Sequence, residues 1–263
     1  MFTIQKYVCA SSLEEAYELN QDKNNRIIAG MLWMRLGKGK VNTAIDISGL
    51  GLDTIEEDDE KFSIGAMVSL RTLEKHESLN SYTNNAVCNA VKDIVGVQFR
   101  NQATVGGSIW GRFGFSDVLT VFLALDTYVE LYKGGIVPLS KFAELKEDND
   151  ILVRIIVKKT PIKVTYRAVR AQKTDFPVLT CATSIINGVV RTSVGARPGR
   201  AKLVIDNSGI LSSGINEASI TKFTSYVADT IPTSKNLRGS AEYRTHLAKV
   251  LLSRNLEELE DLK

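Results

Sequence analysis

The N-terminal part of the chain alternates between short apolar runs and one amphipathic stretch. Residues 2–8 indicate a strand, and Ser12 with Glu15 three positions later forms the capping-box signal of a helix. Residues 26–29 then indicate a second strand, which ends at Gly30. The pattern predicts a β-α-β unit that leads into a glycine turn.

The middle of the chain contains both strand-like and helix-like patterns of apolar residues. Strands are predicted at residues 43–47, 62–66, 128–132, 136–138 and 151–157, with an acidic loop at 53–60. Apolar residues between Ala86 and Ile94 recur at the spacing of one face of a helix. Residues 118–125 are apolar nearly all round, which predicts a helix buried between layers.

The C-terminal part has a different pattern. Residues 164–169, 178–186 and 189–196 indicate strands of an antiparallel sheet, and Asn187-Gly188 suits a type I′ turn between the last two. Helices are predicted at about 217–228 and 240–253. All five prolines lie after residue 137, and the polar segment 158–161 is the favoured boundary. The expected organisation is therefore α+β, with domains at residues 1–160 and 161–263.

Composition narrows the class of protein. The 263 residues are 44% hydrophobic and 24% charged, which is typical of a globular chain with a real core. The net charge is only +3 and the basic residues are scattered, so nucleic acid is not an expected partner. No apolar run approaches the roughly 18 residues of a membrane span and no signal peptide is visible, so we expect a cytoplasmic protein.

The residues that usually carry catalysis or metal binding are sparse. Cys9, Cys88 and Cys181 are far apart and odd in number, which argues against disulfides, a zinc site or an iron–sulfur cluster in this chain. The only histidines, His76 and His246, lie outside the glycine segments described next, so a covalent histidyl link to a cofactor is not expected. No acid–base constellation is visible at interpretable spacings.

Two glycine segments could bind an anion. One is Ile28–Trp33 and the other is Ala103–Ser108, and each follows an apolar, strand-like segment, which for the second is Gln98–Asn101. Glycine lets a phosphate approach main-chain N–H groups without interference from a Cβ. The same glycines are also typical of plain tight turns, and neither segment is a Walker loop or a G-x-G-x-x-G fingerprint.

Ordered motifs along the chain carry a family resemblance. Residues 98–109, QFRNQATVGGSI, with Ser116-Asp117 and Leu123–Asp126 after them, resemble the signature of the FAD-binding subunit of molybdenum hydroxylases. This is the group of xanthine dehydrogenase, carbon monoxide dehydrogenase and nicotinate dehydrogenase. Further matches are Ala29-Gly30, Asp46–Ser48, Ile64–Ala66 and the RGSAEYR segment Arg238–Arg244.

The resemblance implies a fold and a set of cofactor-binding residues. The fold is a two-lobed FAD-binding domain of the PCMH type up to about residue 160, then a smaller α+β domain like that of the carbon monoxide dehydrogenase flavoprotein, with an antiparallel sheet and helices. The residues implied for the FAD pyrophosphate are Ile28, Ala29, Gly30, Met31, Leu32, Trp33, Met34, Thr104, Val105, Gly106, Gly107 and Ser108.

Four further positions match the family less distinctively. Asp117 would bind the nucleotide part, Ile94 and Leu152 correspond to apolar positions near the flavin and the adenine, and Arg167 lies near a basic contact. From the residues alone, Ile94 and Leu152 are equally core residues, Asp117 is equally a helix N-cap, and Arg167 is equally a solvated strand charge.

The chain also departs from the family pattern. Met31 and Leu32 stand at the usual second glycine and threonine of the first segment, and backbone contacts there are expected to survive only if φ stays negative. Trp33 and Trp110 replace smaller or polar residues, and Ser108 replaces an asparagine. The two tryptophans either stack on the flavin or pack between lobes, and the sequence does not decide between these roles.

The resemblance implies an FAD-carrying subunit of a multi-subunit molybdenum hydroxylase, with FAD bound non-covalently. Molybdopterin would reside on a large partner subunit and [2Fe–2S] clusters on a small one, with electrons leaving the flavin for NAD⁺ or another acceptor. Two alternatives stay open: a flavin-free homologue with a structural or assembly role, motivated by the altered first segment, and a stand-alone flavin reductase or oxidase.

Overall fold

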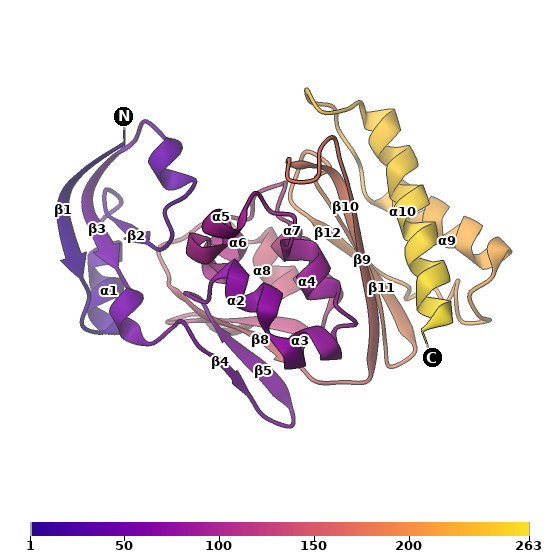
Figure 1. Cartoon of the computed structure of the whole chain (residues 1–263), viewed down its shortest axis with the longest axis horizontal. Coiled ribbons are helices and arrows are strands. Elements are labelled where there is room, and N and C mark those ends of the chain that lie inside the picture. The colour runs from indigo at the N-terminus through magenta and orange to yellow at the C-terminus, as the bar shows by residue number, and fades with distance from the viewer. Residues whose placement is uncertain (1, 263) are drawn as a thin grey trace.

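Three layers of structure follow one another along the chain. The structure is a computed structural model that describes residues 2–262. A first lobe, a second lobe and a C-terminal sheet with two helices lie side by side in chain order (Figure 1). The α+β class predicted from the sequence is confirmed.

The first lobe is a small parallel sheet with one helix. Its elements are β1 (Thr3–Cys9), α1 (Leu13–Asn20), β2 (Arg26–Ile28) and β3 (Lys40–Asp46). The strand order is β1-β3-β2, so the strand that comes last in the sequence lies in the middle of the sheet. Ser12 caps α1 by accepting from the N–H of Glu15, but the Glu15 carboxylate accepts from Ser11 and not from the Ser12 N–H. Only half of the predicted capping box therefore forms.

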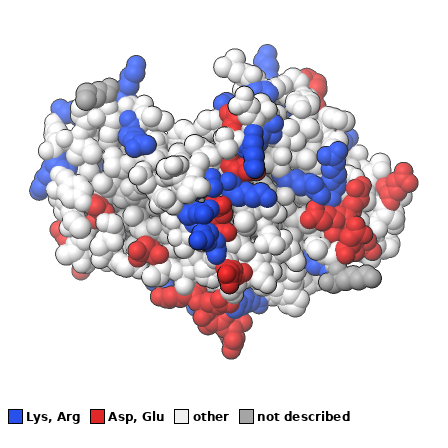
Figure 2. All heavy atoms as spheres, viewed as in Figure 1, with Lys and Arg blue, Asp and Glu red and all other residues white. Residues whose placement is uncertain are grey.

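The second lobe is an antiparallel sheet with short helices over it. The sheet has the order β4-β5-β8-β6-β7, with β4 (Ile55–Glu57), β5 (Lys61–Gly65), β6 (Thr127–Leu131), β7 (Gly135–Pro138) and β8 (Leu152–Lys158). The helices are α2 (Leu70–Lys75), α3 (Glu77–Tyr82), α4 (Ala86–Val91), α5 (Val97–Gln102), α6 (Val105–Trp110), α7 (Asp117–Ala124) and α8 (Leu139–Glu144). The exposed acidic side chains of residues 56–60 form the tip at the β4–β5 hairpin (Figure 2).

The C-terminal layer is an antiparallel sheet covered on both faces. Its strands, in the order β12-β11-β10-β9, are β9 (Ile162–Arg170), β10 (Pro177–Ile186), β11 (Val189–Gly195) and β12 (Lys202–Ile205). Leu179 and Cys181 of β10 face α9 (Glu217–Thr230) and α10 (Ala241–Asp261), whereas Ala182 joins the core of the second lobe. Every residue of β10 except Ile185 is buried, as expected of a strand that is covered on both faces.

Helix α7 joins the second lobe to the C-terminal sheet, and every one of its residues is buried. Thr120 Oγ1 lies 3.0 Å from Thr180 Oγ1 of β10, and Ser184 donates to the carbonyl of Ala124. A Cβ on Gly195 of β11 would lie 2.2 Å from Thr120 Oγ1. The helix and the sheet are thus in close contact through small and hydroxyl side chains. A domain division at residue 160 stays a prediction.

Several element predictions differ from the structure. Residues 98–101 were predicted as strand-like but lie in helix α5, and most of the second glycine segment lies in helix α6. Sequence periodicity missed both helices because six residues are too few to show a helical repeat. The acidic loop contains β4, and β12 went unpredicted. Helix α10 extends past Ser253 to Asp261 because Leu256 and Leu259 continue its buried face.

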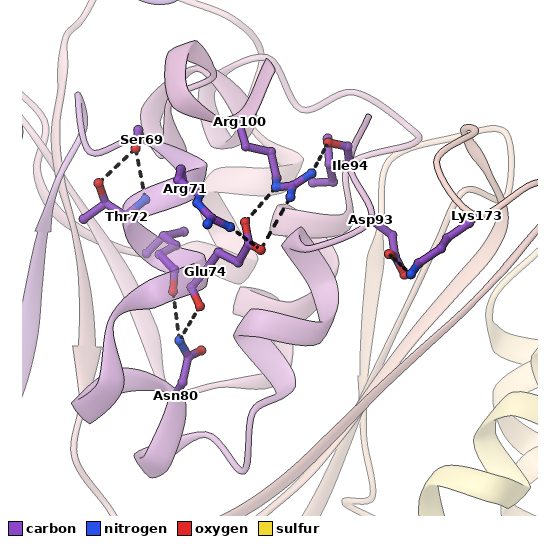
Figure 3. Close-up of polar contacts among 10 residues, drawn as sticks. Ser69, Arg71, Thr72, Glu74, Asn80, Asp93, Ile94, Arg100 and Lys173 are labelled. Carbon is purple, nitrogen blue, oxygen red and sulfur yellow. Dashed lines mark hydrogen bonds and ion pairs between the residues drawn. The ribbon is translucent and has the colours of Figure 1, made fainter. Parts of the chain in front are cut away.

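A partly buried ion pair ties α2 to α5 (Figure 3). Arg100 Nε donates to Glu74 Oε2 at 2.8 Å, and Arg71 Nη1 lies 2.7 Å from Glu74 Oε1. Arg100 Nη1 also donates to the carbonyl of Ile94 at 3.1 Å. The next residue, Val95, has a φ of 50°, which is costly for a β-branched side chain. Arg100 of the QFRN motif therefore holds the turn that leads into α5.

This ion pair predicts a pH-dependent contribution to stability. Burial raises the pKa of Glu74, but hydrogen bonds from Arg100 and Arg71 outweigh it and hold the pKa below its ordinary 4.5. The ionised carboxylate therefore stabilises the fold above that ordinary pKa, and its contribution is lost as the pH falls through the lowered value. We expect Glu74→Gln to reduce the free energy of unfolding by about 1.5–3 kcal/mol near neutral pH, measured by urea denaturation.

The difference between wild type and Glu74→Gln should shrink steadily as the urea series is repeated in acid. Glu56 is the matched control, since its side chain is 72% exposed and lies 3.9 Å from Arg154. Glu56→Gln should change stability by less than about 0.5 kcal/mol at any pH. A Glu74→Gln deficit that stays constant into acid would contradict the assignment.

Candidate cofactor site

A large cavity lies where the three layers meet. Its volume is about 710 Å³, within the usual range for a site that encloses a cofactor. The first lobe contributes residues 27, 29–34 and 37, the second contributes 70, 94–95, 99, 103–104, 107–108, 110–111, 113 and 115–118, and the C-terminal layer contributes 170 and 174–177. Figure 2 shows a notch in the upper outline between the first lobe and the rest of the molecule.

A second cavity of about 380 Å³ adjoins the first. Both are lined by Ile27, Ala29, Met34, Gly107 and Trp110. The two glycine segments of the sequence therefore lie at the junction of two compartments. An elongated ligand with a bulky group at each end would place its middle against these segments.

The two segments touch each other without room for a side chain. A Cβ on Gly30 would lie 1.9 Å from the carbonyl oxygen of Gln102 and 2.7 Å from its carbonyl carbon. These atoms are backbone and cannot rotate away, so only glycine allows this approach. Gly106 is similarly constrained, because its Cβ would lie 2.5 Å from the carbonyl oxygen of Ala66.

The first segment has free backbone donors. Within residues 2–262, none of the N–H groups of residues 30–33 donates a hydrogen bond to another part of the chain. These residues lie along the cavity wall, although Leu32 is largely buried. A run of uncommitted N–H groups in a turn is an arrangement that binds anions such as phosphate.

Met31 has a φ of 56°, in the left-handed region that glycine adopts without strain. The condition stated for this segment, that backbone contacts survive only if φ stays negative, is therefore not met at Met31. Methionine costs about 1–2 kcal/mol in this left-handed conformation. Val95, also left-handed, lines the same cavity, and strained backbone of this kind is concentrated at functional sites.

The second segment contributes surface and hydroxyls but few free N–H groups. Thr104 caps α6, and the N–H groups of Val105 and Gly106 donate to the carbonyls of Val68 and Ala66. Gly107 donates to Thr104 Oγ1 at 3.1 Å, and Ser108 Oγ donates to the Thr104 carbonyl. Of the two segments, the first therefore carries the run of uncommitted backbone donors, and Gly107 of the second lines both cavities.

Only some of the remaining predicted site residues line a cavity. Ile94 lines the larger cavity and Leu152 the smaller one. Ile28 and Val105 are buried and line neither cavity, so they support the segments from behind. Arg167 lies away from both cavities and pairs with Glu258 of α10 at 2.6 Å.

Asp117 lines the larger cavity, but its carboxylate already has partners. Arg170 Nη2 lies 2.5 Å from Asp117 Oδ1, and the Tyr166 hydroxyl donates to the same oxygen. Burial raises the pKa of Asp117, while the Arg170 and Tyr166 contacts oppose that rise. Arg170, three residues beyond Arg167, is thus the arginine that β9 presents to the cavity, and the sequence analysis did not identify it.

Aromatic rings form one wall of the larger cavity. The Trp33 centroid lies 5.2 Å from Phe115 and 5.3 Å from Phe176, and Phe99 and Phe113 lie slightly farther away. This cluster draws on all three layers, so Trp33 packs between lobes and also faces the cavity.

Trp110 lies at the junction of the two cavities. Its ring centroid is 5.8 Å from that of Phe142, and the Arg112 guanidinium lies over both rings. Planar apolar walls of this kind suit a planar heterocycle.

Membrane-spanning helices and metal-binding side-chain clusters are both absent from the described part of the chain. No helix within residues 2–262 is both long and apolar enough to cross a membrane. Over the same residues, no group of three or more His, Cys, Asp or Glu side chains is arranged to hold a metal ion. His76 and His246 line neither cavity.

Relief of the strain at Met31 is directly testable. We expect Met31→Gly to raise the free energy of unfolding by about 1 kcal/mol in urea denaturation, because glycine adopts the observed φ freely. Met34, in the 3₁₀ turn Met34–Leu36 of the same segment, is the matched control. Met34→Gly should instead lower stability by about 0.5–1 kcal/mol. Equal destabilisation by both substitutions would refute the strain at Met31.

Comparisons with known proteins agree with this geometry. Residues 2–160 match the family described as the FAD binding domain in molybdopterin dehydrogenase. The chain is 25% identical to the nicotine 6-hydroxylase medium subunit of Paenarthrobacter nicotinovorans, over 96% of each chain. It is 24% identical to a protein of Escherichia coli strain K12 called YgfM, over 95% of this chain and 94% of that one.

Solved structures share the fold over almost the whole chain. Carbon monoxide dehydrogenase of Oligotropha carboxidovorans superposes with a TM-score of 0.87 at 18% identity, covering 99% of each chain. Quinoline 2-oxidoreductase of Pseudomonas putida 86 gives a TM-score of 0.84 at 17% identity, covering 98% of this chain and 97% of that one. The family match spans more than half of the chain, and so this chain belongs to the FAD-binding domain family of the molybdopterin dehydrogenases, as its motifs predicted.

Proposed function

We propose that this chain is the FAD-carrying subunit of a multi-subunit molybdenum hydroxylase. In this proposal it takes electrons from a [2Fe–2S] subunit and passes them to NAD⁺ or another acceptor, while a molybdopterin subunit hydroxylates the substrate. The observation that carries the proposal is the pair of adjoining cavities, with the uncommitted N–H groups of residues 30–33 on the wall of the larger one. Relatives named as medium subunits of hydroxylases support it.

The residues present fit FAD. The larger cavity, with Ile94 and the aromatic wall, suits the flavin, and the smaller one, with Leu152, suits the adenine. The N–H groups of residues 30–33 would then meet the pyrophosphate from the wall of the larger cavity, where the lining cation Arg170 is paired with Asp117. Lys23 and Arg26 line the smaller cavity and add positive charge there. FAD supplies the redox chemistry when bound, and the protein binds, orients and shields it.

This chain's own side chains have no acid–base task in that role. The carboxylate of Asp117 is paired with Arg170, and the aromatic cluster around Trp33 lines one side of the cavity with apolar rings. The walls therefore offer shape and apolar contact and leave proton transfer to other groups. We propose the domain division at residue 160 and a cytoplasmic location as parts of the same function.

A flavin titration tests the proposal. We expect the purified chain, freed of any flavin, to take up one FAD and to bind FMN more weakly, because FMN would leave the smaller cavity and its contacts unused. Calorimetry and quenching of flavin fluorescence measure both affinities. A preparation from the native source should also contain molybdenum and iron from its partners.

Glycine variants give that titration a matched control. Gly107 lines both cavities, so Gly107→Leu should abolish measurable FAD binding while the helix still forms. Gly49 is exposed and a Cβ there meets only Cys9 Sγ at 3.7 Å, so Gly49→Leu should bind FAD normally. Absence of FAD uptake by the folded wild-type chain would favour the structural or assembly homologue, and NADH oxidation by the isolated chain with oxygen would favour the stand-alone enzyme.

The two tryptophans should respond differently. Trp33→Leu removes the ring that faces the larger cavity and should weaken FAD retention by up to about tenfold, with a shift of the flavin redox potential. Trp110→Leu loses packing on Phe142 at the junction and should lower thermal stability with a smaller shift of the potential. Unchanged retention and potential in Trp33→Leu would leave packing as its only role.

A further inference from the structure

The RGSAEYR motif, Arg238–Arg244, lies outside both cavities, and the proposed function gives it no task. Its first residues end a loop, residues 234–239, and its last residues begin α10. The motif contains two arginines in opposite environments. Arg244 is fully buried, whereas the Arg238 side chain is 41% exposed.

Arg244 ties the loop to the start of strand β10. Its Nε donates to the carbonyl of Val178 at 2.9 Å, and Nη1 donates to the carbonyls of Ser234 at 2.8 Å and Gly239 at 2.6 Å. Its Nη2 donates to Asn236 Oδ1 at 2.6 Å. A buried guanidinium satisfied by neutral acceptors fixes each of them, because losing any one would leave a buried charge with too few partners.

The loop in turn fixes Arg238. Asn236 and Gly239 exchange backbone hydrogen bonds of 3.1 and 3.2 Å across a tight turn, and Asn236 Oδ1 also accepts from the Arg238 N–H at 2.9 Å. The side-chain oxygen of Asn236 thus accepts hydrogen bonds from both arginines of the motif, from the backbone of Arg238 and the side chain of Arg244. The Arg238 side chain leaves this turn in the direction of the β9–β10 hairpin.

Arg238 contacts two residues of the cavity wall from behind. Its guanidinium carbon lies 4.7 Å from the ring centroid of Phe176, and its Nη2 lies 3.7 Å from Asp175 Oδ1. On the inner side, the Phe176 ring lies 5.3 Å from Trp33 and 4.7 Å from Phe115. Phe176 is therefore held between an arginine outside the cavity and aromatic rings inside it.

The same hairpin has a second anchor. Arg170, which pairs with Asp117, donates its Nη1 to the carbonyl of Asp175 at 2.6 Å. Asp175 is thus contacted by arginines from two elements, Arg170 through its backbone and Arg238 through its side chain. Removing Arg238 leaves the backbone anchor in place, so the expected effect is a displaced ring and not an unfolded hairpin.

We propose that Arg238 is a positioning residue that sets Phe176 against Trp33 and so shapes the flavin side of the cavity, with the RGSAEYR motif as its support. The effect on FAD rests on the proposed function, whereas the effect on the Phe176–Trp33 contact does not. Arg238 acts through Phe176 and Asp175 and itself lies outside the cavity. The motif thereby links the C-terminal helix to the cofactor site.

The test reads the contact first without any cofactor. In a Trp110→Phe background, Trp33 is the only tryptophan, and acrylamide quenching reports how exposed its ring is. Arg238→Ala should raise the quenching constant about twofold, close to the value for Phe176→Leu, with thermal unfolding little changed because exposed cation–π pairs contribute weakly. Arg238→Lys keeps a cation over the ring and should restore most of the wild-type value.

Lys235 provides the matched control, since it is an exposed cation of the same loop. Lys235→Ala should leave quenching at the wild-type value. With Trp110 restored, Arg238→Ala should raise the FAD dissociation constant about fivefold and Lys235→Ala should not. Altered quenching in Arg238→Ala, together with a folded wild-type chain that binds no FAD, would support the positioning role and reject the flavin function. Wild-type quenching in a folded Arg238→Ala chain would overturn the proposal.

Discussion

The cavity system depends on a contact between two backbones at Gly30. The first lobe reaches the second there, where a Cβ would lie 1.9 Å from the Gln102 carbonyl oxygen. Residues 30–33, with their unbonded N–H groups, and Gly107 line the larger cavity, and Gly107 also lines the smaller one. A larger side chain at Gly30 would clash with the Gln102 backbone and force the two lobes apart.

The buried arginines are engaged by groups of the protein itself. Arg100 is committed to Glu74 and the Ile94 carbonyl, Arg170 to Asp117, and Arg244 to four neutral acceptors. Arg100 and Arg170 are paired with carboxylates, whereas Arg244 keeps its charge outside both cavities. The uncommitted N–H groups of residues 30–33 lie on the wall of the larger cavity, and Lys23 and Arg26 line the smaller one.

Much of the fold was predictable because its long elements carry clear periods. Strands β8 to β11 and helices α7, α9 and α10 follow from apolar spacing, and the motifs placed both glycine segments. Helices α5 and α6 were not predictable, because six residues contain fewer than two turns and local signals there resemble a strand.

Arg167, whose side chain pairs with Glu258 away from both cavities, has a similar explanation. Side chains alternate along β9, so Tyr166, Ala168 and Arg170 face the second lobe, whereas Arg167 faces α10 and Glu258. Alternation alone could have excluded Arg167 once Asp117 was placed on the other side, but that placement is tertiary information.

The conformation of Met31 bears on whether the altered first segment still forms an anion site. A methionine in place of glycine would be expected to relax the turn to negative φ if local preference decided the backbone, yet φ is 56°. The turn is instead imposed by its surroundings: Gly30 is fixed against Gln102, and Arg35 donates its N–H to the Met31 carbonyl. About 1–2 kcal/mol of local strain is small compared with the packing of two lobes. The methionine therefore occupies a left-handed turn at a cost that the lobe packing can offset, and FAD uptake by the chain decides between a flavin site and a flavin-free homologue.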